Sequence, residues 1–167
     1  MKKSYFKRKT PSKRSKPRVE KFNHWKAYGL TKPAKPRFQG LQGVLWYVVS
    51  RYIRKSEYQQ YNGACVDGCG RIVEDWRDAD CGHFRASSRG FCTRFDRRNL
   101  GLQTKYCNNP TWSPDSAYGF GRTIDERYGA GTADELTRLS HKVCREWTPN
   151  EYDIAIKGYI KLFEELP

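Results

Sequence analysis

The sequence predicts an α+β fold, and three observations support this. Apolar residues in the segment 41–60 recur at the spacing that places them on one face of a helix. Residues 64–96 contain short apolar runs divided by turn residues, a pattern typical of β-strands. The chain beyond residue 112 contains helix-start signals. We therefore expect a helix, then a β-rich segment, then a group of C-terminal helices.

Positive charge is concentrated in residues 1–39, which we interpret as a basic arm, disordered or extended without its partner, before a domain at 40–167. The arm has 14 of the 32 lysines and arginines and one acidic residue, so it carries +13 of the net +14. This charge predicts a polyanionic partner, with nucleic acid favoured over an anionic membrane or a role as a solubility tail. The arm residues expected to contact DNA are Lys7, Arg8, Lys9, Lys13 and Arg14.

Membrane insertion and secretion are not expected. No run of 18 apolar residues is present, and no apolar segment follows the basic start of the chain as it would in a signal peptide. We expect a protein of the cytoplasm. The six cysteines should then be reduced or bound to metal rather than paired in disulfides.

Within the β-rich segment, strands are expected at residues 72–73, 81–86 and 91–95. Asp96 is a helix-capping residue type and predicts a helix over residues 97–106. Further helices are expected over residues 113–128, over 132–146 with a capping box of Thr132 and Glu135, and from a third start at Thr148, Pro149 and Glu151.

Three residues form the candidate active site: His83, Asn99 and Asn108. A histidine on a strand, an asparagine at a loop-to-helix junction and a second asparagine nine residues later fit a ββα-metal hairpin. A neutral imidazole can take a proton from water near pH 7, and a divalent cation can neutralise charge on a phosphodiester. Mg²⁺, or Mn²⁺ in its place, prefers oxygen ligands and keeps several waters, so few protein ligands suffice.

The two asparagines are expected to act differently. Nine residues of continuous helix span about 13 Å, too far for both side chains to bind one ion. Asn108, placed on the predicted helix, is the better metal ligand. Asn99, at the junction, is expected to fix the loop that orients His83.

These motifs together resemble HNH endonucleases, and specifically the phage lambda NinG (Rap) recombination endonuclease family. The resemblance covers residues 41–165 and implies a structure-selective endonuclease for branched DNA, such as Holliday junctions, with His83 as general base and Asn108 as metal ligand. It rests on Tyr52-Ile53-Arg54, Cys65, Cys69-Gly70, Asp80, Gly82-His83-Phe84-Arg85, Arg94-Phe95-Asp96, Asn99, Gln103, Cys107-Asn108, the pattern over residues 136–164 and Trp147-Thr148.

The sequence departs from the HNH pattern directly before the base. Many such enzymes have a metal-binding aspartate there, whereas this chain has Gly82. Asp80 is the expected second metal ligand, although three residues of regular strand would point it away from His83 unless Gly82 allows a bulge. Asp78 is a further candidate, and a solvated surface carboxylate is the alternative for Asp80.

A zinc knuckle is the second predicted metal site. Cys65 and Cys69 have a spacing that zinc knuckles use, and Cys107 adds a third ligand, because Thr104 stands where a fourth cysteine would be expected. Cys81, or alternatively Cys92, would complete the set of four. The other interpretation is that zinc is absent and these cysteines are small buried residues.

Five arginines around the predicted site are candidate phosphate contacts: Arg85, Arg89, Arg94, Arg97 and Arg98. Pairing with nearby acidic residues is the alternative for about half of them. Trp76, Trp112 and Trp147 are expected in the core rather than as base-stacking platforms.

The function predicted from these features is metal-dependent cleavage of DNA. The alternative is a non-catalytic zinc-knuckle DNA-binding protein. A third possibility is a structural RNA-binding protein, which only the basic arm supports. A homodimer is expected, because paired cuts in a junction need two sites.

Overall fold

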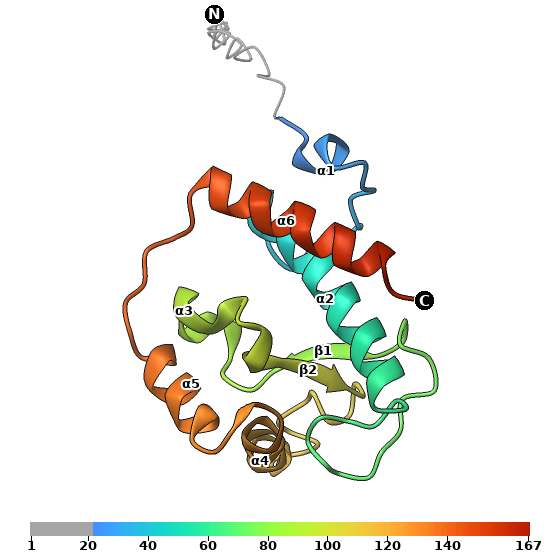
Figure 1. Ribbon diagram of the computed structural model, residues 1–167, viewed down its shortest axis with the longest axis vertical. Helices are drawn as coiled ribbons and strands as arrows, with labels where there is room; N and C mark the ends of the chain where they lie inside the picture. Colours follow the sequence, from blue (N-terminus) through green and yellow to red (C-terminus); the bar gives the residue numbers. More distant parts are fainter. Residues whose placement is uncertain (1–21) are drawn as a thin grey trace, which may run out of the picture.

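Helix α2 and a β-hairpin form the centre of the molecule. The computed structural model describes residues 22–167. These residues are mostly helical and contain one two-stranded antiparallel hairpin. Helix α2 (Gly40–Gln60) lies between α6 (Pro149–Glu164) and the hairpin (Figure 1). The apolar face predicted for residues 41–60 is confirmed, because Val44, Leu45, Val48, Val49 and Ile53 are all buried along it.

The hairpin pairs β1 (Asp80–His83) with β2 (Leu100–Gln103) in a regular register, without a bulge. Gly82 lies opposite Gly101, and a Cβ atom on Gly101 would come within 2.7 Å of the Val66 side chain. The two glycines therefore let other side chains approach one face of the hairpin closely. The strand expected over residues 81–86 is confirmed in its first half only.

Two expectations for the segment 91–106 are wrong. Residues expected as a strand form the short helix α3 (Phe91–Arg94), and the helix expected over 97–106 is a single 3₁₀ turn, η2 (Arg97–Asn99), followed by β2. Asp96 caps only that turn, accepting a hydrogen bond from the backbone of Arg98 at 2.9 Å. The sequence Leu-Gly-Leu-Gln is buried at all four positions in β2, and this burial overrides helical propensity.

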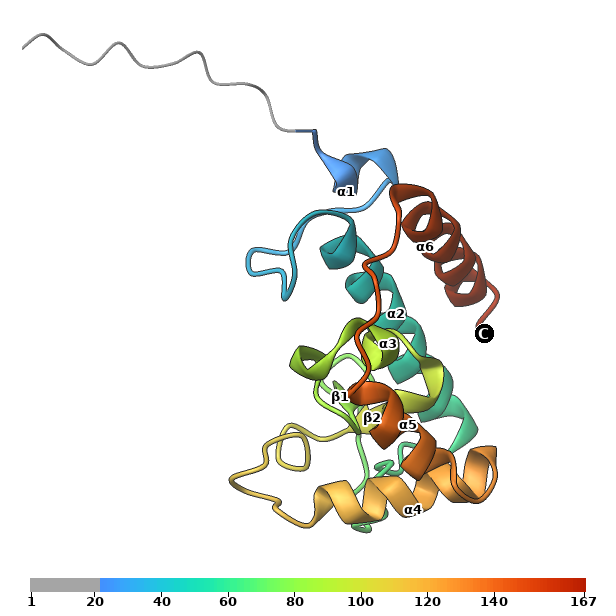
Figure 2. The same ribbon diagram turned by 90° about the vertical axis from the view of Figure 1, so that its left-hand side faces the viewer.

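The remaining short elements are η1 (Ser87–Arg89) and an isolated bridge between Ala64 and Ile72, which replaces the strand expected at residues 72–73. Along the chain, β2 is followed by α4 (Ser116–Tyr128) and α5 (Thr132–Ser140), which precede α6. In space these two helices lie at the opposite end of the molecule from α6 (Figure 2).

Helix α5 is shorter than expected, and its predicted capping box is absent. Gly131 occupies the N-cap position, so Thr132 is the first helical residue and its hydroxyl donates to the carbonyl oxygens of Tyr128 and Gly129 instead. The helix start predicted at Thr148, Pro149 and Glu151 is confirmed in α6, where Thr148 and Glu151 form a capping box, each accepting a hydrogen bond from the other's backbone N–H.

Part of the segment expected as an arm packs on the domain. Residues 22–39 contain α1 (His24–Ala27), and Trp25 is only 5% exposed, with its ring edge-on to Tyr47 of α2. Lys7, Arg8, Lys9, Lys13 and Arg14 lie outside the described residues, as does the side chain of Arg89. None of the described helices is long and apolar enough to cross a membrane.

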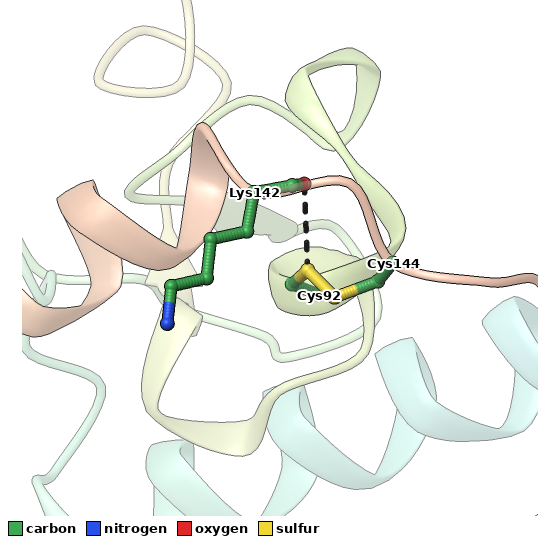
Figure 3. Close-up of a disulfide and its surroundings, with 3 residues drawn as sticks. All are labelled: Cys92, Lys142 and Cys144. Atoms are coloured by element: carbon green, nitrogen blue, oxygen red, sulfur yellow. Dashed lines mark hydrogen bonds between the residues drawn. A yellow bond between two sulfur atoms is a disulfide. The ribbon is translucent and has the colours of Figure 1, made fainter.

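A disulfide joins Cys92 in α3 to Cys144 in the segment between α5 and α6 (Figure 3), with the two Cα atoms 5.5 Å apart. The expectation that all the cysteines are reduced or metal-bound is therefore wrong for this pair. It also removes Cys92 from the candidate zinc ligands.

A buried carboxylate connects the central elements. Glu57 of α2 is 1% exposed, and it accepts a hydrogen bond from the backbone of Leu102 in β2 at 2.8 Å. Arg97 and Arg127 form ion pairs with the same carboxylate at 2.9 and 3.1 Å. One side chain thus fixes β2, η2 and α4 against α2.

We expect Glu57→Ala to lower the free energy of unfolding by about 3–5 kcal/mol, because two arginines and a buried N–H lose their partner. Urea denaturation followed by circular dichroism measures this. Glu126→Ala is the matched control, since its exposed pair with Arg122 should contribute less than about 1 kcal/mol. Equal effects of the two substitutions would contradict the role given to Glu57.

Candidate functional site

A pocket of about 550 Å³ lies beside the hairpin, and it brings together residues from β1, β2, the following loop and α4. His83 and Asn108, predicted as base and metal ligand, both line it. Gln103 from β2 and Ser116 from α4 complete its polar wall. The convergence of an imidazole with an amide 25 positions later is thus present in the fold.

His83 is held in an orientation in which one ring nitrogen makes no hydrogen bond with a described residue. Its ring stacks on Trp46 of α2, with centroids 4.8 Å apart, and Nε2 lies 3.1 Å from the carbonyl oxygen of Arg94. A carbonyl oxygen only accepts, so Nε2 is the protonated nitrogen and Nδ1 of the neutral ring carries a lone pair. Burial, with the charge of Arg37 nearby, lowers the pKa of His83 to about 4, so the ring is neutral at pH 7.

Asn108 lies in a turn before α4, not on a helix as expected. Its backbone N–H donates to the carbonyl of Thr104 at 3.0 Å. Its side-chain nitrogen donates to the Asp80 carboxylate at 2.9 Å, which fixes the amide plane. The side-chain oxygen accepts no hydrogen bond from the described residues and is therefore available to a ligand.

Asp80 is not part of the lining of the His83 pocket, although its pairing partner Gln103 is. The register is regular, so the bulge considered at Gly82 is absent, and the side chains of Asp80 and His83 point to opposite faces of the hairpin. Asp80 instead lines a smaller neighbouring pocket, which it shares with Asn108 and Arg37. Its observed contact is with the amide of Asn108, which it orients.

Gln103 also lines the pocket, although in the sequence it stood out only as part of the family resemblance. Its side-chain nitrogen donates to Ser116 Oγ at 2.9 Å and to the Cys107 carbonyl at 3.4 Å. Its side-chain oxygen, which accepts no hydrogen bond within the described part of the chain, lies over Gly82, where a Cβ atom would collide with it. The oxygen of Asn108 would lie 3.2 Å from that same Cβ. Two free amide oxygens thus flank the position where the HNH pattern has an aspartate.

Asn99 contacts the backbone and not the pocket. It is fully buried, and its side chain accepts from the N–H of Arg85 at 2.7 Å and donates to the carbonyl oxygens of Arg85 and Thr93. It holds the chain after β1 against α3. Because α3 also provides the carbonyl that contacts His83, these hydrogen bonds connect Asn99 to the segment that holds the His83 ring, the contact expected for a loop-fixing residue.

Arg37 is a pocket residue that the sequence did not single out. Its guanidinium donates to Ser87 Oγ at 3.1 Å and lies 5.0 Å from the centroid of the Trp46 ring. It lines the pocket of His83 as well as the neighbouring one. Its position follows from tertiary packing of a segment expected as an extended arm, so no sequence motif marks it.

Among the predicted phosphate contacts, Arg97 and Arg98 are engaged elsewhere. Arg97 pairs with Glu57, and Arg98 pairs with Asp96 at 2.8 Å and Glu135 at 3.1 Å. Arg94 donates to the carbonyl of Ser87 and to the side chain of Gln42. Arg85 lies over the ring of Phe84 and forms no ion pair with any described residue, so it remains the best candidate of this group.

A second cluster, with the chemistry of a zinc site, adjoins the pocket and shares Cys107 with its lining. Ligand atoms of Cys65, Asp67, Cys69 and Cys107 all lie within 4.8 Å of one another, and the sulfurs of Cys69 and Cys107 are 3.3 Å apart. Three cysteines and one carboxylate form a four-ligand set suited to zinc. Cys81, predicted as the fourth ligand, is instead packed in the core with α2, and Asp67 occupies its place.

Hydrogen bonds connect the cluster to its surroundings and to the pocket. The backbone N–H of Thr104 points at Cys65 Sγ at 3.3 Å, as expected next to a metal-bound sulfur. Burial raises the pKa of Cys69 to about 12, so a bound cation would have to displace its proton. Ser116 Oγ donates to Asp67 at 2.7 Å while accepting from Gln103, and thus joins the cluster to a pocket side chain.

A family model described as bacteriophage lambda NinG protein matches residues 1–166. The chain belongs to the NinG family. The match extends over the basic arm as well as the domain, which is further than the resemblance over residues 41–165 indicated. No match was found among curated proteins or among solved structures.

We expect purified protein of this NinG family member to contain one zinc ion per chain, and Asp67→Ala to lower that content by at least tenfold, since a structural site needs four ligands. Elemental analysis after dialysis measures both. Cys81→Ala is the matched control and should retain the metal, because Cys81 lies outside the cluster. Zinc lost from the Cys81 variant and kept by the Asp67 variant would refute the assignment.

Proposed function

We propose that this NinG family member is a metal-dependent DNA endonuclease of the HNH type. One observation carries the proposal: a neutral imidazole, held through Nε2, lines the same pocket as two amide oxygens that accept no hydrogen bond from described residues. Phosphodiester hydrolysis needs a base for water together with oxygen ligands for a cation.

His83 is the general base in this proposal. Its Nδ1 accepts the proton of a water molecule as the water oxygen attacks phosphorus, and Nε2 stays bonded to the Arg94 carbonyl. The developing imidazolium is stabilised by that carbonyl. The stack on Trp46 holds the ring in plane, so the proton acceptor is positioned before substrate binds.

The donor set at Gly82 fits Mg²⁺ or Mn²⁺, which prefer oxygen ligands and need few of them from the protein. Asn108 and Gln103 would hold the ion through their side-chain oxygens, and Asp80 orients the Asn108 amide. When bound, such an ion neutralises charge on the scissile phosphate and on the leaving oxygen. The side chains of Asn108 and Gln103 carry no charge. The negative charge of the phosphate would therefore be balanced by the metal ion and by nearby cationic side chains.

Two guanidinium groups are suited to receive the phosphate backbone. Arg37 lines the pocket next to His83, and Arg85 follows β1 without an acidic partner among described residues. The basic arm adds charge that binds nucleic acid without regard to sequence. We extend the proposal in two ways on the basis of the family resemblance. The enzyme is selective for branched DNA in phage recombination, and it acts as a homodimer that makes paired cuts.

A non-catalytic zinc-knuckle DNA-binding protein is the second candidate. It is favoured by the four-ligand cluster together with a glycine where HNH enzymes carry a carboxylate. The two candidates differ in one measurement, because only the nuclease cleaves branched DNA when Mg²⁺ is supplied and stops when it is omitted.

We expect His83→Ala to lower cleavage of a branched DNA substrate by at least about 100-fold, the usual contribution of a general base, with the DNA dissociation constant changed less than twofold. Gel assays of cleavage and binding on the same substrate measure the two effects. His141→Ala, an exposed histidine beyond α5, should cleave normally. Binding lost together with cleavage would show that His83 is structural.

We expect deletion of residues 1–21 to weaken DNA binding and to flatten its dependence on salt, because ten lysines and arginines are removed. The deletion stops before Trp25 and Arg37, which contribute to the core and the pocket. Dissociation constants measured from about 50 to 200 mM salt test this. An unchanged salt slope would remove the arm from the DNA interface.

A further inference from the structure

We propose that Tyr106 and Trp112 form a stacking site for an unpaired DNA base next to the active-site pocket, an inference that rests on the proposed nuclease function. Both residues lie in the loop between β2 and α4, residues 104–115, which Figure 2 shows projecting from the body of the molecule. The pocket takes Cys107, Asn108, Pro110, Ser113 and Pro114 from this same loop.

Both rings are exposed, although the sequence led us to expect burial of Trp112. Trp112 is 57% exposed and Tyr106 43%, so the core position expected for Trp112 is wrong. Their centroids are 6.2 Å apart with planes inclined by 27°, an offset stack. A large aromatic pair held at the surface and absent from the three core clusters is available to a partner.

Local contacts arrange this pair in advance. The backbone of Trp112 donates to the Asn109 carbonyl at 3.1 Å, and the side chain of Asn109 accepts from the backbone of Thr111 at 2.9 Å. Arg71 lies 4.1 Å from the centroid of the Tyr106 ring, close enough for a cation–π contact. A platform that is already ordered loses less conformational entropy when a ligand binds.

The chemistry around the platform favours a nucleic-acid base over an apolar peptide. Arg71 and Lys105 are positive, and residues 104–114 contain no acidic side chain. Successive bases of a single strand stack on aromatic rings while cations bind the backbone. A base in a duplex is covered by its neighbours, so the platform would engage only a base that is unpaired or displaced.

Proximity to the pocket gives this site a role in substrate choice. A base held by Tyr106 and Trp112 would belong to the strand whose phosphate enters the pocket, because Asn108 and the aromatic pair share one short loop. Duplexes that contain unpaired bases, such as those at a branch point or a flap, would therefore bind more tightly than continuous duplexes. This gives selectivity for branched DNA a structural basis in this chain.

The test uses the full chain and a duplex bearing a short single-stranded flap, with 2-aminopurine at the first unpaired position. We expect binding without added Mg²⁺ to quench the 2-aminopurine fluorescence by stacking. Trp112→Ala should abolish the quenching and raise the dissociation constant for the flap about tenfold, within the range known for one stacked base. Affinity for a fully paired duplex of the same length should change less than twofold.

Tyr118→Ala is the matched control, because this tyrosine of α4 is 79% exposed and makes no stack with a described aromatic ring. Trp112→Phe should restore most of the quenching. Unaltered zinc content and melting temperature would show that the Trp112→Ala variant is folded.

Equal losses of affinity for both DNA probes, or none in the Trp112→Ala variant, would overturn the proposal. Quenching without any cleavage would support the stacking site and reject the nuclease, whereas cleavage without quenching would do the reverse.

Discussion

The carboxylate of Glu57 is the contact on which the arrangement of the site depends. It binds the backbone of Leu102, so it determines how β2 lies along α2, and it pairs with Arg97 and Arg127 from two further elements. Gln103 follows Leu102 directly, and Asn99 precedes β2. The positions of two site residues are therefore set by a buried charge that belongs to neither the pocket nor the cysteine cluster.

From this centre, polar contacts extend in two directions. Asn99 holds the chain after β1 against α3, whose carbonyl fixes the ring of His83. Ser116 joins Gln103 to Asp67, so the pocket and the cysteine cluster share one hydrogen-bonded chain. A metal bound by Asp67 would thus also order the side chain of Gln103, which lines the pocket. A change at the cysteine cluster would therefore be transmitted to the pocket through these hydrogen bonds.

Periodicity and capping motifs predicted α2 and α6 well, because both depend on nearest neighbours along the chain. They failed for β2, where burial between packed layers outweighs local preference. The meeting of His83 and Asn108 followed from the order of motifs. Asp67 and Arg37 could not be found in this way, since only the folded chain brings them beside their neighbours. The engagement of Arg97 by Glu57, 40 residues earlier, was equally hidden.

The disulfide between Cys92 and Cys144 closes a covalent ring that spans a sequence separation of 52 residues (Figure 3). That ring contains β2, α4, α5 and the loop at residues 104–115. A protease that nicks this projecting loop would leave two fragments that remain linked through sulfur. On a denaturing gel the nicked molecule would run as one chain until a reductant is added, and its β2 strand would still be anchored to α2.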